Sequence, residues 1–357
     1  MKLERLWKRS QPPLIGLDIG SHSAKAVLLS KTEDGWVLEN ASQVAIPTGA
    51  VEEHEIKDFE AVGNALRPLL TRFGKKNNLV AAAVAGSSVI TKIIYVDGGG
   101  TEADLEAQVQ IEADHLIPFP LEEVSLDFEV IGTNSSDTSR KDILLSACRT
   151  EHVESRVAAL ETAGYTPKVM DIEAFALGRT LAVMSKQFPD DMANNTVAMV
   201  DIGANMMLFS IVSDGETIYS REQPFGGEQF NQAVVGYYGM EPHAVEEAKL
   251  AGTLPANYDF EVLAPFQTQM VQQIRRNIQI FSTSSGISEI DALILSGGSA
   301  ILPGTVELLR EELALHAIVA NPFVNMTVAE SLDQEKLAAS AHQYAIACGL
   351  AMRGHHE

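Results

Sequence analysis

The 357-residue sequence predicts an α/β fold with two related lobes, each built on a mixed sheet, and an inserted α+β subdomain. An apolar strand ending in Asp-Ile-Gly, a small turn and a returning strand occur twice, at 14–29 and 197–212. This spacing of about half the chain indicates two related halves rather than a short-period solenoid. Between the two copies lies a strand, helix, strand, strand, helix order, which is typical of a small α+β module.

The composition limits the class of protein. A hydrophobic fraction of 46% and a charged fraction of 21% are ordinary for a globular chain, and the length suits two or three domains. The net charge of −22 argues against a nucleic-acid surface, which needs clustered Lys and Arg, and against direct binding to an anionic membrane. The basic stretch at 1–9 is a local exception. It is either a frayed tail or a weak membrane or partner contact.

The sequence shows no sign of membrane insertion or export. No apolar run approaches the roughly 20 residues that span a bilayer, and the N-terminus lacks the apolar centre of a signal peptide. We therefore expect a cytoplasmic protein, in which Cys148 and Cys348 are buried free thiols. The nine histidines show no zinc-binding spacing, so no transition-metal site is predicted.

The first repeat is expected to grow into a mixed α/β unit. An apolar run at 35–44 follows the Asp34-Gly35 turn and extends the sheet. Apolar residues at helical spacing predict a helix over 59–73 that ends at Gly74, and a strand follows at 79–84.

The inserted subdomain is predicted to begin with a strand that ends in three glycines. A capping box formed by Thr101 and Asp104 would open its first helix. Its elements are expected in this order: a strand at 89–96, a helix ending at His115, strands at 121–131 and 143–147, and a helix at 151–163 closed by Gly164.

The second repeat copies the first, including an Asp-Gly turn before its third strand. The remaining elements are expected in this order: a strand at 169–172, a helix to 184, a third strand at 217–221, a helix opened by Gly226-Gly227, helices at 241–250 and 261–281, a strand at 292–295 running into Ser296-Gly297-Gly298-Ser299, a helix to about 315, and an alanine-rich helix at 335–352.

The turn after each Asp-Ile-Gly is suited to presenting backbone N–H groups to a phosphate. Asp18 and Asp201 would then face Mg²⁺, through water, because this ion keeps part of its hydration shell. A single motif of this kind is more often only a turn. The second copy favours a pair of facing hairpins that clamp one polyphosphate.

The two Asp-Ile-Gly hairpins, the helix start at Gly226-Gly227 and the late Ser296-Gly297-Gly298-Ser299 turn occur in a fixed order. Together they resemble the ATP-binding motifs of the actin, Hsp70 and hexokinase superfamily, which has an actin-like/ribonuclease H-like fold. The resemblance narrows to FtsA-related actin-like bacterial proteins and, within them, to the PilM family of type IV pilus assembly proteins. It rests on segments spread over nearly the whole chain: LIGLDIGSHSAKAVLL, VAAAVAGSSVITKII, QIEADHLIPFPLEEVSLDFEV, VMDIEAFAL, AMVDIGA, FGGEQF, ILSGGSA and ANPF with CGLAMR.

The resemblance implies a site for ATP and Mg²⁺, with Glu173 where relatives carry the acid or amide that orients the attacking water. The implied nucleotide-binding positions are Gly20, Ser21, His22, Ser23 and Lys25 around the first phosphate loop, Gly203, Ala204 and Asn205 in the second, Gly226, Gly227, Glu228, Glu246 and Lys249 at ribose and adenine, and Gly297, Gly298 and Ser299 in the adenosine loop.

The resemblance also implies the subdomain boundaries. These are an N-terminal tail at 1–12, subdomain 1A at 13–88 and 167–195, the inserted subdomain 1C at 89–166, subdomain 2A at 196–224 and 289–334, subdomain 2B at 225–288, and a C-terminal helix at 335–357 that returns to 1A.

One departure from the family pattern bears on activity. Active relatives usually continue the second loop with glycine and threonine, whereas this chain has Asn205-Met206-Met207. Losing positioned donors can cost orders of magnitude in rate while leaving binding largely intact. We therefore expect ATP binding with slow or absent hydrolysis, at most a weak ATPase.

The resemblance implies a cytoplasmic scaffold of the type IV pilus machine, peripheral at the inner membrane through a partner and involved in twitching motility. It would bind the cytoplasmic N-terminal segment of PilN in a groove between 1A and 1C. Other inner-membrane and motor components of the pilus, and further copies of the chain, are additional expected partners. Two alternatives stay open: an FtsA-like filament-forming division protein, although the sequence lacks a C-terminal amphipathic membrane helix, and a sugar or acetate kinase, although no substrate acid stands out.

Overall fold

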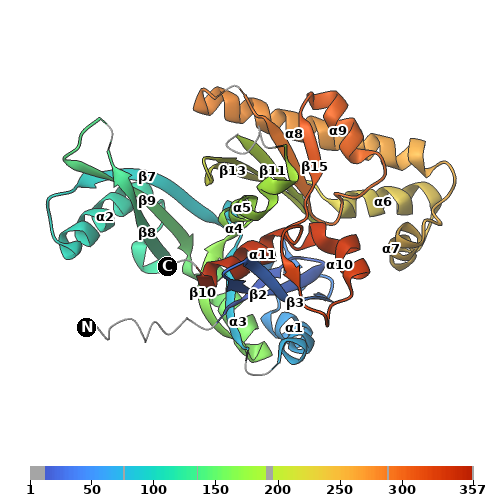
Figure 1. Ribbon diagram of the computed structural model, residues 1–357, viewed down its shortest axis with the longest axis horizontal. Helices are drawn as coiled ribbons and strands as arrows, with labels where there is room; N and C mark the ends of the chain where they lie inside the picture. Colours follow the sequence, from blue (N-terminus) through green and yellow to red (C-terminus); the bar gives the residue numbers. More distant parts are fainter. Residues whose placement is uncertain (1–12, 75–76, 135, 190–195, 288, 356–357) are drawn as a thin grey trace.

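The computed structural model describes residues 13–74, 77–134, 136–189, 196–287 and 289–355, so the predicted tail at 1–12 lies outside the described residues. Two mixed sheets define two lobes, and a smaller sheet forms a module that projects to one side (Figure 1). The predicted α/β class and the duplication are both visible in the sheets. Among the described helices, none combines the length and the apolar character needed to cross a bilayer.

The first lobe contains a six-stranded sheet in the order β10-β6-β1-β2-β3-β16. Its strands are β1 (Ile15–Ile19), β2 (Ser23–Thr32), β3 (Gly35–Ala45), β6 (Leu79–Val84), β10 (Thr166–Ile172) and β16 (Thr327–Val328). The antiparallel β1-β2-β3 meander is the one predicted from the first repeat. A small hairpin of β4 (Val51–Glu52) and β5 (Glu55–Ile56) follows it.

The second lobe contains a five-stranded sheet in the order β13-β12-β11-β14-β15. Its elements are β11 (Val197–Ile202), β12 (Met206–Ser213), β13 (Glu216–Pro224), β14 (Ala292–Ser296), β15 (His316–Val319), α6 (Gly227–Tyr238), α7 (Pro242–Ala251), α8 (Ala264–Ser285) and α9 (Thr305–Leu313). Large buried side chains such as Phe209, Phe225, Phe230 and Phe281 fill the core between this sheet and its helices.

Two helices, α4 (Glu173–Arg179) and α11 (Ala345–Met352), pack in a core that includes residues of both sheets. Glycines allow the close approach. A Cβ added to Gly349 would lie 1.8 Å from the carbonyl oxygen of Ala176, and one added to Gly16 would lie 2.0 Å from that of Ala347. Each of these contacts excludes any larger side chain. The lobes therefore share one central helical layer.

The alanine-rich C-terminal segment is not the single helix that the sequence predicts. It consists of α10 (Gln334–Ser340), a 3₁₀ turn (Ala341–Gln343) and α11. The carbonyl oxygen of His342 accepts a hydrogen bond from the N–H of Gly297 at 3.0 Å. This carbonyl is directed to a loop of the second lobe, which explains the break in the helix.

The projecting module is built on three antiparallel strands in the order β7-β9-β8. Its elements are β7 (Val89–Asp97), α2 (Glu102–Leu116), β8 (Val124–Thr133) and β9 (Arg140–Arg149). The capping box predicted for Thr101 and Asp104 is present at the start of α2. Leu105, Val109 and Ala113 of α2 are buried in the module's own core.

Helix α3 (Thr150–Ala163) packs against α1 (Phe59–Phe73), although the predicted insertion at 89–166 includes it. Its buried residues, Ala159 and Leu160 among them, belong to the core of the first lobe. We therefore propose that the inserted subdomain ends after β9. The other subdomain boundaries stay predictions.

The two cysteines have the predicted character. Cys148 on β9 and Cys348 on α11 are both buried and both free. Burial raises the pKa of each thiol, so neither is activated as a thiolate.

Candidate nucleotide-binding site between the lobes

The two Asp-Ile-Gly turns have the same backbone structure. In the first, the N–H of Gly20 donates to the carbonyl of Ser23 at 3.2 Å, and in the second the N–H of Gly203 donates to the carbonyl of Met206 at 2.9 Å. Asp18 lies opposite Lys25 in one hairpin, and Asp201 lies opposite Leu208 at the equivalent position of the other. The duplication seen in the sequence is therefore a structural duplication.

The tips of the two turns meet across the lobes. The side-chain amide of Asn205 donates to the hydroxyl of Ser21, with 3.0 Å between Nδ2 and Oγ. His22 beside this contact is exposed, and Ser23 is half-buried. The residues predicted for the first and second phosphate loops thus lie together, although 184 positions separate Ser21 from Asn205.

Two aspartates lie below the turns. The Asp18 carboxylate is almost fully buried and lies 3.4 Å from Nζ of Lys25. Burial raises the pKa of Asp18 even though Lys25 opposes the shift. Burial also raises the pKa of Asp201 to about 6, against a hydrogen bond from Ser296 and with a further contribution from the charge of Asp18. Two neighbouring carboxylates whose charged forms are disfavoured fit a divalent cation such as Mg²⁺.

The glycine pair at the start of α6 packs this helix against the second turn. The N–H groups of Gly227 and Glu228 donate to the carbonyls of Gly203 and Ala204 at 3.0 and 2.8 Å. A Cβ on Gly226 would lie 2.3 Å from the carbonyl oxygen of Ala204. Because these N–H groups already have backbone partners, the pair positions the second turn, and any contact with a ribose would have to come from other atoms.

The glycine loop after β14 lies on the other side of the same turn. Gly297 adopts a φ of +86°, and a Cβ there would lie 2.3 Å from the carbonyl oxygen of Ile202. Ser299 donates from its N–H to the same carbonyl at 3.4 Å, and its hydroxyl oxygen lies 2.9 Å from the position of a Cβ on Gly227. A Cβ on Gly298 would point into open space. Three predicted segments therefore contact the second turn: the first turn, the start of α6 and the glycine loop after β14.

Glu246 and Lys249 lie further along, on α7, where they form an ion pair with each other. Lys249 Nζ is also 3.4 Å from Oδ1 of Asn231 on α6 and 6.0 Å from the ring centre of Phe230. These contacts tie α7 to α6. The predicted role of both residues at ribose and adenine stays a prediction.

Glu173 begins α4, and its side chain is buried. Its Oε2 lies 3.7 Å from Nδ1 of His54, and Nε2 of His54 lies 3.8 Å from Oε2 of Glu222. Burial alone raises the pKa of Glu173, but His54, together with Arg156 and Lys25, outweighs this effect and brings the pKa below its ordinary value. Sequence reasoning identified Glu173 and missed the other two, since His54 follows two glutamates in an ordinary polar turn and Glu222 directly follows the predicted strand at 217–221 with no motif around it.

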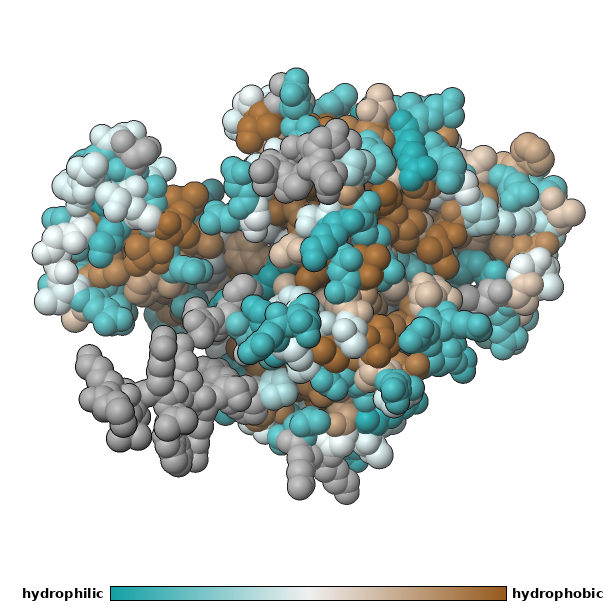
Figure 2. Space-filling view, viewed as in Figure 1, coloured by the Kyte–Doolittle hydropathy of each residue, from teal (hydrophilic) through white to brown (hydrophobic). Residues whose placement is uncertain are grey.

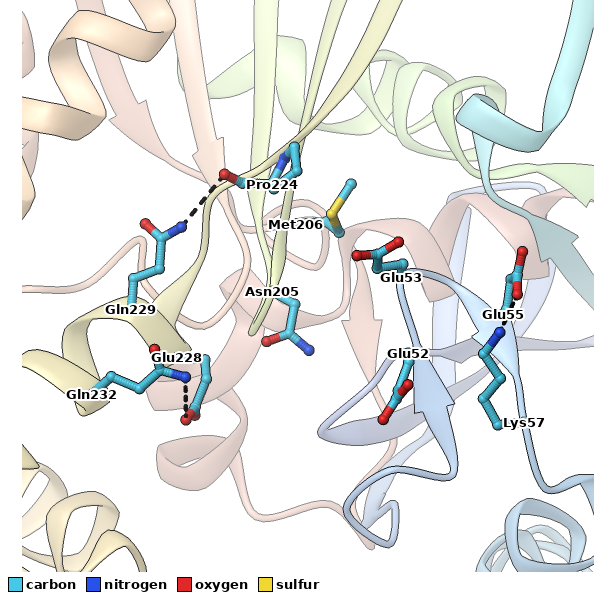
Figure 3. Close-up of a pocket in the computed structure, with 10 residues that line it drawn as sticks. All are labelled: Glu52, Glu53, Glu55, Lys57, Asn205, Met206, Pro224, Glu228, Gln229 and Gln232. Atoms are coloured by element: carbon cyan, nitrogen blue, oxygen red, sulfur yellow. Dashed lines mark hydrogen bonds and ion pairs between the residues drawn. The ribbon is translucent and has the colours of Figure 1, made fainter.

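A cavity of about 480 Å³ opens beside the second turn (Figure 3). It is lined by Glu52, Glu53, Glu55 and Lys57 around the β4–β5 hairpin of the first lobe and by Asn205, Met206, Pro224, Glu228, Gln229 and Gln232 of the second. Of the predicted nucleotide-binding residues, only Asn205 and Glu228 line it. Its acidic wall is poorly suited to a bare triphosphate, so this cavity is an opening next to the turns rather than the phosphate pocket.

Comparisons with known proteins identify the fold and the family of the chain. The family model for type IV pilus assembly protein PilM matches residues 16–355. A solved PilM-PilN type IV pilus biogenesis complex has a TM-score of 0.81 and 25% identity, covering 97% of this chain and 100% of that chain. Ethanolamine utilization protein EutJ from Carboxydothermus hydrogenoformans has a TM-score of 0.56 and 14% identity, with 96% and 89% covered.

Among curated relatives, the cell division protein FtsA of Bacillus subtilis is 24% identical over 358 residues, which is 86% of this chain and 78% of FtsA. Together these likenesses confirm the predicted actin-like, two-lobed α/β fold and the predicted family.

Proposed function

Because the chain belongs to the PilM family of type IV pilus assembly proteins, we propose that it is a nucleotide-binding scaffold of that assembly machinery. The observation that carries the nucleotide site is the meeting of two equivalent turns, at Asn205 and Ser21, above Asp18 and Asp201. Backbone N–H groups of the turns and the Lys25 ammonium would bind the phosphates of ATP. The two aspartates would hold Mg²⁺, which supplies charge neutralisation when bound.

We expect ATP to be held far better than it is cleaved. The second turn runs into Met206 and Met207, which offer no hydroxyl, and Met207 is fully buried. Glu173 faces His54 rather than an open position where water would be activated. A carboxylate whose pKa is lowered is also a weaker general base.

Titration of the purified chain with Mg-ATP tests the site. Asp18→Ala and Asp201→Ala are each expected to weaken affinity at least tenfold, because each removes one carboxylate from the proposed cation site. Asp34→Ala, in the exposed turn between β2 and β3, is the matched control and is expected to stay within twofold of the unaltered chain. Unchanged affinity in both site variants would show that the turns do not clamp the nucleotide.

We propose that the N-terminal cytoplasmic segment of PilN docks on the open sheet face of the projecting module, whereas the expected groove between 1A and 1C stays a prediction. One face of the module's sheet is covered by α2, against which Ile94 and Val96 of β7 are buried. The alternate residues, Ile93 and Tyr95, lie on the opposite face and are each 53% exposed. Figure 2 shows apolar surface over this module.

The open face suits an extended peptide. Ile93 lies beside Leu144 of the central strand β9, so the apolar side chains extend from β7 to β9, whereas Glu129 of β8 lies on the far side of Leu144. β7 and β8 are the edge strands, where a peptide can add main-chain hydrogen bonds while side-chain pockets give selectivity. The solved PilM-PilN complex, with its 0.81 TM-score, supports the choice of partner. The chain would then reach the inner membrane through PilN.

Binding of a peptide with the PilN N-terminal sequence, followed by fluorescence anisotropy, tests this docking site. Ile93→Ser and Tyr95→Ser are each expected to weaken binding at least tenfold by removing apolar contact area. Ile111→Ser is the matched control, since Ile111 is 59% exposed on the outer side of α2 in the same module. No binding to the unaltered chain, with or without Mg-ATP, would contradict the proposal.

A second candidate is an FtsA-like, filament-forming division role, which rests on the 24% identity to FtsA. Sedimentation with Mg-ATP separates the two candidates. Polymers that form without PilN would favour the filament role, whereas a chain that stays in the supernatant would favour the scaffold.

A further inference from the structure

Three ionisable side chains with little exposure to solvent form a row across the boundary between the lobes, here called the interlobe triad: Glu173, His54 and Glu222. His54 lies in the turn between β4 and β5 of the first lobe, and Glu222 lies on β13 of the second lobe. Nδ1 of His54 faces Glu173 at 3.7 Å, and Nε2 faces Glu222 at 3.8 Å. One imidazole therefore spans two carboxylates that come from different elements.

The triad is enclosed by protein. The side chains of Glu173 and Glu222 are 7% and 1% exposed, and that of His54 is 18% exposed. Nε2 of His54 and Oε2 of Glu222 are buried without a hydrogen-bond partner in the described structure. Two carboxylates so deeply buried require a cation nearby, because an unpaired buried charge is strongly disfavoured.

Two consecutive residues with positive φ form the β4–β5 turn. Glu53 and His54 have φ values of 46° and 65°, which L-residues other than Asn, Asp and His seldom adopt, so Glu53 carries the backbone strain of this turn. A two-residue hairpin of this kind normally carries Asn-Gly. Arg156 supports the turn, since its Nη2 donates to the carbonyl of His54 at 2.7 Å. Strain of this kind persists where the surrounding structure holds the residue in place.

Glu222 makes a second contact with the first lobe. Its Oε1 accepts a hydrogen bond of 2.7 Å from the N–H of Gly86, which opens the 3₁₀ turn after β6. A Cβ on Gly86 would lie 3.4 Å from the same oxygen, which is an ordinary contact distance, so the hydrogen bond itself defines this approach. The carboxylate of Glu222 is therefore a single group through which His54 and Gly86 both hold the second lobe.

We propose that His54 is a positioning residue whose imidazolium bridges Glu173 and Glu222, thereby joining the two lobes and fixing where the Glu173 carboxylate lies at the nucleotide site. The bridge between the lobes stands on the contacts alone. Its effect on Glu173 chemistry rests on the proposed nucleotide-binding function.

The charges around His54 favour its protonated form. Burial alone lowers the pKa of His54, but Glu173 and then Glu222 outweigh this and raise it to about 9, against a smaller lowering by Arg156. Asp18 also interacts with His54, and Lys25 with Glu173. The ring nitrogens face different carboxylates, so the imidazole spans the gap between them. One ligand atom from each of the three groups also lies within 4.8 Å of the others, so Zn²⁺ binding is the competing outcome that the experiments below test.

The first test needs no nucleotide. In His54→Gln at pH 7, Glu173 and Glu222 lose the cation between them, and hydrogen exchange of the Gly86 amide is expected to accelerate at least tenfold. His115→Gln, an exposed histidine on α2, is the control and is expected to leave this amide unchanged. In the unaltered chain, NMR titration of the His54 ring is expected to give a pKa of about 9.

A double variant separates charge from shape. Glu222→Gln removes one of the two negative charges while keeping an oxygen that accepts from Gly86. His54→Gln with Glu222→Gln is therefore expected to return Gly86 exchange to within about threefold of the unaltered chain. A purely structural role of the imidazole would leave the double variant as fast as the single one, and that result would overturn the proposal.

A third experiment, an assay with Mg-ATP, distinguishes this proposal from the proposed function. With Mg-ATP, His54→Gln is expected to change turnover at least fivefold while affinity changes less than threefold, because the phosphate turns stay intact. If the unaltered chain binds no nucleotide, the proposed function fails. The hydrogen-exchange and NMR titration results still show whether His54 bridges the two lobes. An ordinary pKa for His54, or stoichiometric Zn²⁺ binding that His54→Gln abolishes, would overturn the bridge.

Discussion

His342 is a buried side chain that the fold keeps uncharged. It is 2% exposed, and burial lowers the pKa of its ring to about 4. A histidine whose pKa is lower in the folded chain than in the unfolded chain contributes stability above pH 6.5 that is lost as the pH falls toward 4. Its carbonyl also accepts from Gly297, so the same residue fixes the glycine loop beside the second turn.

His342→Gln is therefore expected to flatten the acid limb of the stability profile. The free energy of unfolding of the unaltered chain should fall by on the order of 3 kcal/mol more than that of the variant between pH 6.5 and 4, as the ring takes up a proton only on unfolding. Urea unfolding at several pH values measures this. His243→Gln, at an exposed position of α7, should keep the full acid slope.

At the scale of elements, the start of α6 shows how a glycine positions the site. The N–H groups of Gly227 and Glu228 bond to the second turn, and the backbone passes Ala204 so closely that Gly226 has no room for a side chain. Gly236 lies in the same helix, and a Cβ there meets no atom within 4 Å. The two glycines therefore have opposite expected responses to the same substitution.

Gly226→Ala is expected to destabilise the chain by about 2 kcal/mol and to weaken Mg-ATP binding, because the added methyl pushes the second turn away from the first. Gly236→Ala is expected to stabilise it by about 0.5–1 kcal/mol, since alanine favours the helix and fits the space. Thermal unfolding and ATP titration check both. Equal effects of the two substitutions would contradict the positioning role of Gly226.

Many of the helices and strands were predictable from the sequence. The two hairpins, the helix at 59–73 and the capping box at Thr101 follow from short-range patterns of apolar spacing and capping residues. The predictions failed where contacts between residues far apart in the sequence determine the structure. The amphipathic face of α3 indicates a helix but not which core it joins, and the 335–352 helix is interrupted by a hydrogen bond from Gly297, which lies far away in the sequence.

The residues of the candidate site likewise fall into two groups, those with a local sequence signal and those without one. Asp18, Asp201 and the glycine motifs carry local signals, and the structure brings their segments together. His54 and Glu222 lack such signals, because their chemistry exists only once β5, α4 and β13 have packed. That Gly226 and Gly227 serve the turn through their backbone was likewise not visible in a motif that the resemblance assigns to ribose and adenine.

At the scale of the whole molecule, the lobes share a core whereas the module has its own. We therefore expect β1 and β11 to lose protection from hydrogen exchange at the same urea concentration, because neither sheet can keep the central layer buried alone. Residues of the module are expected to open independently. Exchange measured by mass spectrometry across a urea series tests this, and separate midpoints for β1 and β11 would contradict it.

Gly349→Ala is expected to act on both lobes together. The added methyl would overlap the carbonyl of Ala176, at 1.8 Å, and separate α11 from α4. A loss of at least about 3 kcal/mol is expected from such overpacking, with the midpoints of both sheets lowered equally. Gly132→Ala in the module, where a Cβ meets no atom within 4 Å, is the control.

The contacts of Gly16 and Gly349 also limit how the lobes can move. Each places a backbone carbonyl where a methyl group would otherwise lie, so α11 is in close contact with β1 at Gly16 and with α4 at Gly349. Sliding along the helix axes would drive these carbonyls into neighbouring side chains, whereas a small rotation about the α4–α11 contact preserves them. We therefore expect this helix pair to act as a pivot, about which a change at the two turns would become a change in the angle between the lobes.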